Sequence, residues 1–301
     1  MLTLRPHQQR ALAALENNSF GQVIVPTGGG KTLVMIKDTE RRLLAATTPQ
    51  TIVVVAPRIL LANQLCDEFW NALNGVVNAE MFHVHSGETS FGSSTKVQQI
   101  QCHHGVCKSA GIHEIIFTTY NSLRRIVESD IDIDCIYYDE AHNAVRRDFF
   151  ESVLNVESKS YYFFTATPKH TRNAYGRGMN NSTVYGPVLE SVPAPELINN
   201  GSILAPEVIS YEVDFERVKG QFSYESDKDT LTNLIEDIDA DGNKILVAAP
   251  SSKVMFNLLS KTTVLDFFHE KGYDVLHITS KYGAYVNKTK VNREQFFDTF
   301  N

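Results

Sequence analysis

The chain has 301 residues, of which 43% are hydrophobic and 21% are charged, and its formal net charge at pH 7 is −7. This length and composition indicate an ordinary soluble protein that is large enough for two domains. The acidic balance excludes a surface that is basic all over, although a nucleic-acid-binding protein needs only a local basic stripe.

Processing and membrane signals are absent from the sequence. The first residues, Met1 to His7, lack the apolar segment of a signal peptide, and no stretch approaches the roughly 18 apolar residues of a membrane span. Four cysteines in a chain of 301 residues do not form a disulfide framework and fit a reducing compartment. We therefore expect a cytoplasmic protein, or an intracellular protein of a virus or phage, without a membrane association.

The first predicted elements are a helix and a strand that leads into a glycine-rich segment. Pro6 is typical of a helix start, and the apolar run 23–25 predicts a strand. Three consecutive glycines after a strand allow backbone N–H groups to turn inward around phosphate oxygens, and the next helix adds the positive end of its dipole. The residues expected to hold a nucleotide are Pro26, Thr27, Gly28, Gly29, Gly30, Lys31 and Thr32.

Within this segment, Lys31 is expected to contact the β- and γ-phosphates, and Thr32 to bind Mg²⁺. The strict Gly-x4-Gly-Lys-Thr pattern is not met, because Val25 stands where its first glycine belongs. Taken alone, the segment could also be a simple glycine-rich turn.

Further apolar runs predict a parallel sheet covered by helices on both faces. After Arg58, the side chains of Leu61, Leu65, Phe69 and Leu73 fall on one face of a predicted helix, which should pack on the sheet. The polar segment 86–95 predicts a surface loop. The remaining strands are predicted at 52–55, 115–117, 135–138 and 161–164.

The predicted strand 135–138 is followed directly by Asp139-Glu140-Ala141-His142. Hydrolysis of a bound nucleotide triphosphate needs Mg²⁺ held opposite the phosphate loop and a water molecule aimed at the γ-phosphorus. Asp139 is expected to orient the Mg²⁺, and Glu140 to polarise the water. The glycine-rich segment and the segment 139–142 occur together in this chain. Their combination favours a site that binds and hydrolyses a nucleotide triphosphate over a simple glycine-rich turn.

Proline and glycine residues between 187 and 206 indicate a domain boundary, which divides the chain into domains 1–206 and 207–301. Beyond it we predict a helix near 227–239, a strand at 244–248, a helix after Pro250, a strand at 275–278 and a helix at 293–300. Only two strands are predicted in the second domain, whereas a complete domain of alternating strands and helices would have about five or six. The chain is therefore expected to be part of a longer protein.

Four motifs in this order resemble those of superfamily 2 helicases: the phosphate loop, Ala56-Pro57-Arg58, Asp139-Glu140-Ala141-His142 and Thr165-Ala166-Thr167-Pro168. Among these proteins the chain is most similar to the group of type III restriction subunits, the UvrB-like N-terminal domain and related phage or viral helicases. The resemblance implies an α/β, RecA-like P-loop NTPase fold with a partial second RecA-like lobe. It also implies an ATP-dependent helicase or translocase that uses ATP and Mg²⁺.

By position, the resemblance implies that Arg5 and Gln8 contact the adenine, although a helix-capping proline with solvated polar neighbours explains the same residues. It implies that Thr165 and Thr167 couple the ATP state to domain movement through His142. The alternative is a buried threonine pair whose hydrogen bonds are satisfied at a strand end.

The same resemblance implies contacts with the nucleic-acid backbone, without base specificity, and DNA is favoured over RNA. The expected contacts are Arg58 and Thr119 in the first domain, and Thr279 and Ser280 in the second. Residues 251–253 are a further candidate. Helix N-caps require the same Ser and Thr residues, so capping is the alternative. Restriction or replication proteins are the expected protein partners.

The segment Cys102-His103-His104-x-x-Cys107, with His113 nearby, offers only half of a zinc site, so we interpret it as a surface or partly buried helix. No Gln-x-x-Gly-Arg-x-x-Arg motif, the source of the arginine finger in this superfamily, occurs in the 301 residues. We therefore expect weak ATP binding and slow turnover from this chain alone. A motor subunit of a restriction system and a non-hydrolysing ATP- and nucleic-acid-binding module are the rival interpretations.

Overall fold

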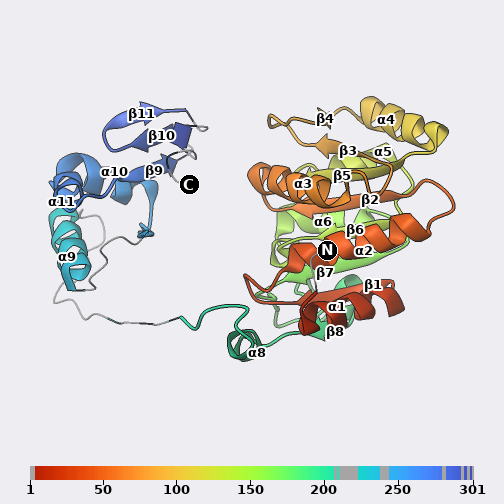
Figure 1. Ribbon diagram of the computed structural model, residues 1–301, viewed down its shortest axis with the longest axis horizontal. Helices are drawn as coiled ribbons and strands as arrows, with labels where there is room; N and C mark the ends of the chain where they lie inside the picture. The colour runs from red at the N-terminus through yellow and green to blue at the C-terminus, as the bar shows by residue number, and fades with distance from the viewer. Residues whose placement is uncertain are drawn as a thin grey trace. The chain divides into compact units, whose positions relative to one another are not determined.

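The computed structural model (Figure 1) describes residues 4–206, 223–237, 244–279 and 283–292, and the single positions 208, 210, 295, 296 and 299. The chain separates into two compact units, Met1–Pro206 and Glu207–Asn301. Each unit is described by itself. No helix among these residues combines the length and the apolar character that a membrane span requires.

The first unit is built on an eight-stranded sheet with the order β4-β3-β5-β2-β6-β7-β1-β8. All of its neighbouring strands pair in parallel. The parallel sheet predicted from the apolar runs is thus confirmed. The strands are β1 (Phe20–Ile24), β2 (Thr51–Ala56), β3 (Ala79–Val84), β4 (Gly92–Ser93), β5 (His113–Thr119), β6 (Cys135–Tyr138), β7 (Tyr161–Thr165) and β8 (Val188–Ser191).

Helices cover both faces of this sheet because the strands send alternate apolar side chains to opposite sides. In β2, for example, Ile52 and Val54 belong to one core, and Val53 and Val55 belong to the other. The first core includes α1 (Pro6–Asn17), α2 (Lys31–Ala45), α3 (Ile59–Leu73) and α8 (Ala194–Asn199). The second includes α4 (Val97–Ala110), α5 (Leu123–Ser129), α6 (Arg147–Asn155), α7 (Ser182–Tyr185) and the 3-10 helix η1 (Ala141–Asn143).

Two sequence predictions about the first unit can be compared directly with the structure. Leu65, Phe69 and Leu73 on α3 are buried in the first core, and Leu61 packs against it, as their spacing predicted. The segment predicted as a surface loop, 86–95, is a connection that contains only the two-residue strand β4.

Helix α2 is fixed to the sheet by a buried carboxylate. Asp38 is fully buried and accepts hydrogen bonds from Arg41 at 2.6 Å, Arg42 at 2.7 Å and the Tyr137 hydroxyl at 2.6 Å. Arg42 also donates to the Tyr162 hydroxyl at 2.6 Å. A buried charge requires such partners, so this network holds the helix against β6 and β7.

The second unit has helices and a small antiparallel sheet among its described residues. Its helices α9 (Tyr224–Asp237) and α10 (Ser252–Lys261) confirm the helices predicted near 227–239 and after Pro250. Ile235, Leu258, Val264 and Phe268 form its core. The remaining elements are α11 (Val264–Glu270), β9 (Leu276–Thr279), β10 (Gly283–Val286) and β11 (Thr289–Val291), with the sheet order β11-β10-β9.

The strand predicted at 244–248 is wrong, because residues 244–249 form no regular element. Leu246 is 94% exposed. An apolar run becomes a strand only where another strand pairs with it, and none of the described strands pairs with this segment. The helix predicted at 293–300 falls mostly outside the described residues.

Candidate functional site

The phosphate-loop segment, residues 26–32, joins the end of β1 to the start of α2. Gly28 and Gly30 have φ angles of 80° and 81°, which only glycine adopts readily. Gly29 N–H donates to the Pro26 carbonyl at 3.0 Å. The N-cap of α2 is Gly30, which brings no side chain to cap the helix.

Backbone donors in this loop are available for a ligand. In the described part of the chain, no hydrogen bond engages the N–H groups of Gly30, Lys31 or Thr32. Unpaired N–H groups at a helix start, together with the helix dipole, form an anion-binding arrangement. The loop therefore has the backbone donors that an anion such as phosphate requires.

The ammonium group of Lys31 lies at the carboxyl edge of the sheet and is 9% exposed. It donates one long hydrogen bond, 3.4 Å, to the Val25 carbonyl, and lies 3.7 Å from Glu140 Oε1. An ammonium group has three N–H donors, so Lys31 keeps capacity for anionic oxygens. The structure thus brings together Lys31 and Glu140, which are more than a hundred positions apart in the sequence.

Asp139 follows the last residue of β6, and its N–H donates to the Val55 carbonyl at 2.9 Å. Burial raises the pKa of its carboxyl to about 6, with a smaller contribution from the Glu140 charge, while Lys31 acts in the opposite direction. A divalent cation would stabilise the ionised form of such a group. Thr32 is adjacent to Lys31 and Asp139 to Glu140, so the hydroxyl and the carboxylate expected to bind Mg²⁺ lie at the same edge of the sheet.

Glu140, His142 and Thr165 form a chain of contacts at this edge. Glu140 has a φ angle of 46°, a strained conformation for a residue with a side chain. His142 Nδ1 lies 3.3 Å from Glu140 Oε2 and 3.1 Å from Thr165 Oγ1. Burial lowers the pKa of His142, although the Glu140 charge opposes this effect. The contacts connect the end of β6 with the end of β7.

Thr167 lies just beyond this chain of contacts. Its N–H donates to Thr165 Oγ1 at 3.2 Å. Thr165 is fully buried, whereas Thr167 is exposed. The two residues are therefore not the buried pair considered as an alternative, and the coupling role of both stays a prediction.

The N-terminal motif packs against the phosphate loop. The side-chain amide of Gln8 donates to the Gly29 carbonyl at 3.3 Å, and its Oε1 accepts from Arg5 N–H at 2.9 Å, which caps α1. The Arg5 guanidinium is exposed and reaches the Ser202 carbonyl at 3.5 Å. His7, which the sequence analysis missed, is fully buried and donates from Nε2 to the Gly29 carbonyl at 2.8 Å. Adenine recognition by Arg5 and Gln8 stays a prediction.

The candidate nucleic-acid contacts of the first unit also follow strand ends. Arg58 is exposed at the N-cap of α3, just after β2, and Thr119 ends β5. The Thr119 hydroxyl donates to Ser122 Oγ at 3.3 Å. Because the carboxyl ends of parallel strands share one edge, both residues lie on the same edge as Lys31 and Glu140.

In the second unit, Thr279 ends β9, and Ser280 lies outside the described residues. Ser251 caps α10 by accepting a hydrogen bond from Val254 N–H at 3.2 Å. The capping alternative is thus correct for Ser251.

Tyr120 lies in the segment 119–122 that is expected to contact nucleic acid, but its contact with Asp139 was not predicted from the sequence. It is 1% exposed, and its hydroxyl donates to the Asp139 carbonyl at 2.9 Å. Its own N–H donates to the Ala56 carbonyl at 3.2 Å. No motif singles out this tyrosine, because the contact depends on strand order.

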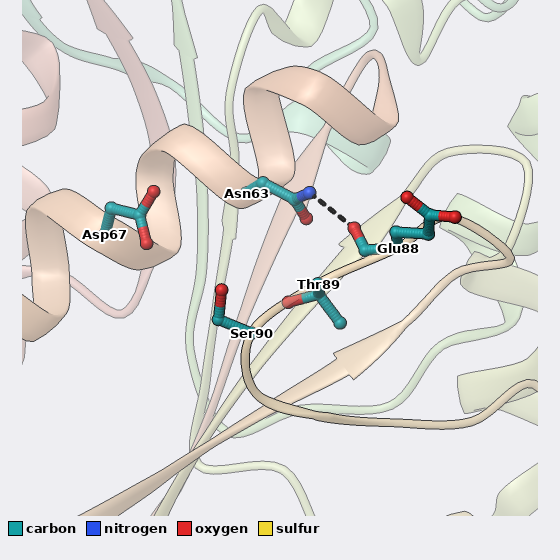
Figure 2. Close-up of a pocket in the computed structure, with 5 residues that line it drawn as sticks. All are labelled: Asn63, Asp67, Glu88, Thr89 and Ser90. Atoms are coloured by element: carbon teal, nitrogen blue, oxygen red, sulfur yellow. Dashed lines mark hydrogen bonds between the residues drawn. The ribbon is translucent and has the colours of Figure 1, made fainter. Parts of the chain in front are cut away.

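A polar pocket of about 350 Å³ lies between α3 and the segment that follows β3 (Figure 2). The Asn63 amide donates to the Glu88 carbonyl at 2.8 Å across this pocket. Its two carboxylates disfavour phosphate, and none of the phosphate-loop residues lines it, so it is separate from the candidate nucleotide site. The lining residues are Asn63, Asp67, Glu88, Thr89 and Ser90.

Comparisons with known proteins identify the family of this chain. The family model of the type III restriction enzyme res subunit matches residues 1–170. The type I restriction enzyme SauCOLORF180P endonuclease subunit of Staphylococcus aureus (strain COL) is 23% identical over 218 residues, which cover 68% of this chain. The chain spans about a fifth of the length of that relative, 21%.

Solved structures show a similar fold. A nuclease-deletion mutant of the type ISP restriction-modification enzyme LlaGI, in complex with a DNA substrate mimic, matches with a TM-score of 0.57 and 22% identity over 78% of this chain and 22% of that one. The ATP-dependent type ISP enzyme LlaBIII, bound to DNA, matches with a TM-score of 0.55 and 20% identity over 66% of this chain and 16% of its own. At these identities the matches establish the fold alone.

The family model covers more than half of the chain, and its span contains the phosphate loop, the Asp139–His142 segment and Thr165. The chain therefore belongs to the type III restriction enzyme res-subunit family, whose members are superfamily 2 helicase-like proteins.

Proposed function

We propose that this chain carries the motor of an ATP-dependent DNA translocase or helicase. The observation that supports this most directly is the 3.7 Å approach of Lys31 Nζ to Glu140 Oε1 beside a phosphate loop with unpaired N–H groups. Phosphoryl transfer to water requires a phosphate-binding cation and a carboxylate within one small space, and these two side chains meet that requirement.

Each residue of the proposed site has a role that its chemistry permits. The loop residues Pro26 to Thr32 cradle the phosphates, and Lys31 neutralises charge on the β- and γ-phosphates. Thr32 and Asp139 supply oxygen ligands for Mg²⁺. ATP with Mg²⁺ supplies the phosphoryl group whose transfer to water drives movement. Glu140 orients that water molecule and accepts its proton.

Coupling and base recognition complete the proposal for the first domain, residues 1–206. His142 and Thr165 already contact each other, so a change at Glu140 can reach β7 through them. We assign Thr167 to the same coupling, and Arg5 and Gln8 to the adenine.

Arg58 and Thr119 are proposed to grip the DNA backbone, and Thr279 and Ser280 to do so from the second domain, residues 207–301. The restriction enzymes LlaGI and LlaBIII, which share the fold, have structures with DNA or a DNA mimic, and this supports DNA over RNA. Backbone contacts of this kind carry no base specificity.

Within this proposal, a motor subunit of a type I or type III restriction-like system is the favoured biological setting, because the curated relative is a restriction endonuclease subunit. The nuclease would then lie in another part of the protein or in a partner chain. The alternative to an ATP-hydrolysing motor is a protein module that binds ATP and DNA without hydrolysing ATP.

The test is the ATPase rate measured with and without duplex DNA. Lys31→Ala and Glu140→Gln should each abolish DNA-stimulated turnover. Lys37→Ala and Glu40→Gln are matched controls, because these residues pair with each other on α2 and should leave the rate unchanged. Tight binding of ATP and DNA without turnover, in a chain that carries an arginine-finger motif, would refute the motor and support the module.

The chain alone should turn over slowly, because its 301 residues contain no Gln-x-x-Gly-Arg-x-x-Arg motif. An arginine finger contributes about 10³ to 10⁵ in rate. Comparing this chain with one that includes the motif tests the point, and equal rates would contradict it.

A further inference from the structure

A cluster of metal-ligand side chains lies between α4 and β5, apart from the nucleotide site. His103 and Cys107 are one helical turn apart on α4, and Glu114 is the second residue of β5. One ligand atom from each lies within 4.8 Å of the others. Of this cluster, the sequence motif contains only His103 and Cys107, which lie on α4. The fold brings the Glu114 carboxylate on β5 next to them.

The distances within the cluster are close to those between the ligands of one ion. His103 Nδ1 donates to Glu114 Oε1 at 2.6 Å, since a carboxylate can only accept. Cys107 Sγ lies 3.8 Å from His103 Nδ1. Ligands 2.0 to 2.3 Å from a tetrahedral ion are separated from one another by roughly 3 to 4 Å, so small movements would accommodate an ion.

The neighbours of Glu114 in the sheet add negative charge. Glu80 on β3 is its register partner, and side chains at paired positions project from the same face. The Glu80 charge also acts on the Cys107 thiol. Like charges on paired strands repel each other, and a bound cation would relieve this repulsion.

Outer contacts hold these groups in place. His104 Nδ1 donates to the other carboxylate oxygen of Glu114 at 2.8 Å, and the Thr51 hydroxyl lies 3.3 Å from the same ring nitrogen. The Phe82 ring stacks on His103 with centroids 4.1 Å apart. Hydrogen-bonded carboxylates and oriented imidazoles are the surroundings that metal ligands have in proteins.

We propose that His103, Cys107 and Glu114 bind one Zn²⁺ ion, with the fourth position open to water. A thiolate, an imidazole and a carboxylate together suit zinc better than magnesium or calcium, which prefer oxygen ligands only. The His103 side chain is 25% exposed and gives the ion a path from solvent, whereas the Glu114 side chain is 1% exposed. The ion would fix α4 to the sheet.

Binding exchanges protons in a defined way. Cysteine binds a metal as the thiolate, so the Cys107 thiol gives up its proton when an ion binds. The ion replaces that proton, which leaves to solvent, and the His103 proton moves from Nδ1 to Nε2. One proton is therefore released for each ion bound.

This inference does not rest on the proposed motor function. Glu114 lies at the amino end of β5, whereas the candidate nucleotide site lies at the carboxyl ends of the strands. The alternative is a metal-free arrangement in which the two histidines serve only as hydrogen-bond partners of the buried Glu114 carboxylate.

Titration of the full chain with Co²⁺ alone, monitored by absorption, tests the proposal, because a thiolate bound to cobalt gives a charge-transfer band in the near ultraviolet. The wild type should show the band at one equivalent, and Zn²⁺ should remove it. Cys107→Ser should lose it. Cys102→Ser is the matched control, because Cys102 is exposed on the same helix, and it should keep the band.

Two further measurements separate binding from folding. Without metal, Cys107→Ser should unfold at a somewhat lower temperature than the wild type, because Cys107 is buried, and Zn²⁺ should raise the midpoint of the wild type only. His104→Gln should weaken binding about 10- to 100-fold, as the loss of an outer hydrogen-bond partner does. Absence of the band in the wild type, or its survival in Cys107→Ser, would overturn the site and support the metal-free arrangement.

Discussion

The Tyr120 hydroxyl donates a hydrogen bond to the backbone carbonyl of Asp139 at 2.9 Å. Tyr120 directly follows Thr119, a proposed DNA contact, and Asp139 precedes the proposed catalytic carboxylate Glu140. Tyr120 N–H also bonds to Ala56 at the end of β2. The side chain and the backbone of one buried residue thus connect the ends of β2, β5 and β6 in the proposed motor.

From this contact we predict that Tyr120→Phe lowers the ratio of ATPase rates measured with and without DNA. The change removes one hydroxyl and leaves the ring, so the protein should unfold only about 0.5–1.5 kcal/mol more easily. Tyr138→Phe is the matched control, since Tyr138 is equally buried and its hydroxyl has no hydrogen-bond partner among the described residues. An unchanged ratio in Tyr120→Phe would exclude this connection.

Asp38→Asn should destabilise the first unit by about 1.5–3 kcal/mol, because it leaves two partly buried arginine groups without their carboxylate. Asp38 is fully buried between Arg41, Arg42 and the Tyr137 hydroxyl. Glu40→Gln, on the same helix, should change the free energy of unfolding by less than about 0.5 kcal/mol. Denaturant unfolding measures the change in the free energy of unfolding for both variants. If the two changes are equal, the network does not anchor α2.

Gly30→Ala should weaken nucleotide binding. Its φ angle is 81°, and a Cβ there would overlap the Gln8 side-chain amide, which packs on the phosphate loop. Gly111→Ala is matched in backbone strain, with a φ angle of 71°, but a Cβ at Gly111 meets nothing within 4 Å. Each substitution should cost about 1–2 kcal/mol of stability. Only Gly30→Ala should lose affinity for labelled ATP, and equal affinity in both variants would argue against a nucleotide at this loop.

The stability of the protein should fall below neutral pH because of His83. Burial, and to a lesser extent the neighbouring His85, lowers the pKa of His83 to about 4 from its usual 6.5. Between these values the unfolded chain binds a proton that the folded chain does not, so the free energy of unfolding decreases by up to about 1.4 kcal/mol for each pH unit lost.

Urea denaturation at several pH values between 7 and 4.5 measures how steeply the free energy of unfolding changes with pH. His83→Gln should give a shallower slope than the wild type. His170→Gln should keep the wild-type slope, because His170 is exposed. A slope that is the same in all three proteins would show that His83 is not responsible.

The sequence predicted the first unit well because its strands are buried on both faces and therefore read as continuous apolar runs. Helix α3 was equally visible, since Leu65, Phe69 and Leu73 repeat every four residues. The segment 244–248 shows the limit of this reasoning. It has the same apolar character, but its state depends on a pairing partner, which local sequence does not specify.

For the candidate site, the motif residues were identifiable because each follows a predicted strand. The contacts between these residues could not be identified from the sequence. The approach of Lys31 to Glu140, and that of Tyr120 to Asp139, depend on the order in which strands lie side by side. Glu114 was missed for the same reason, because the fold places it under α4.

Strand β6 has only four residues, and its last two side chains point to opposite faces of the sheet. Tyr137 bonds to Asp38 on the face that carries α2, while Tyr138 stacks on Phe163 on the other, with centroids 4.6 Å apart. The two residues that precede Asp139 therefore pack in different hydrophobic layers, one on each face of the sheet. The position of the Asp139 backbone depends on the packing of both layers together.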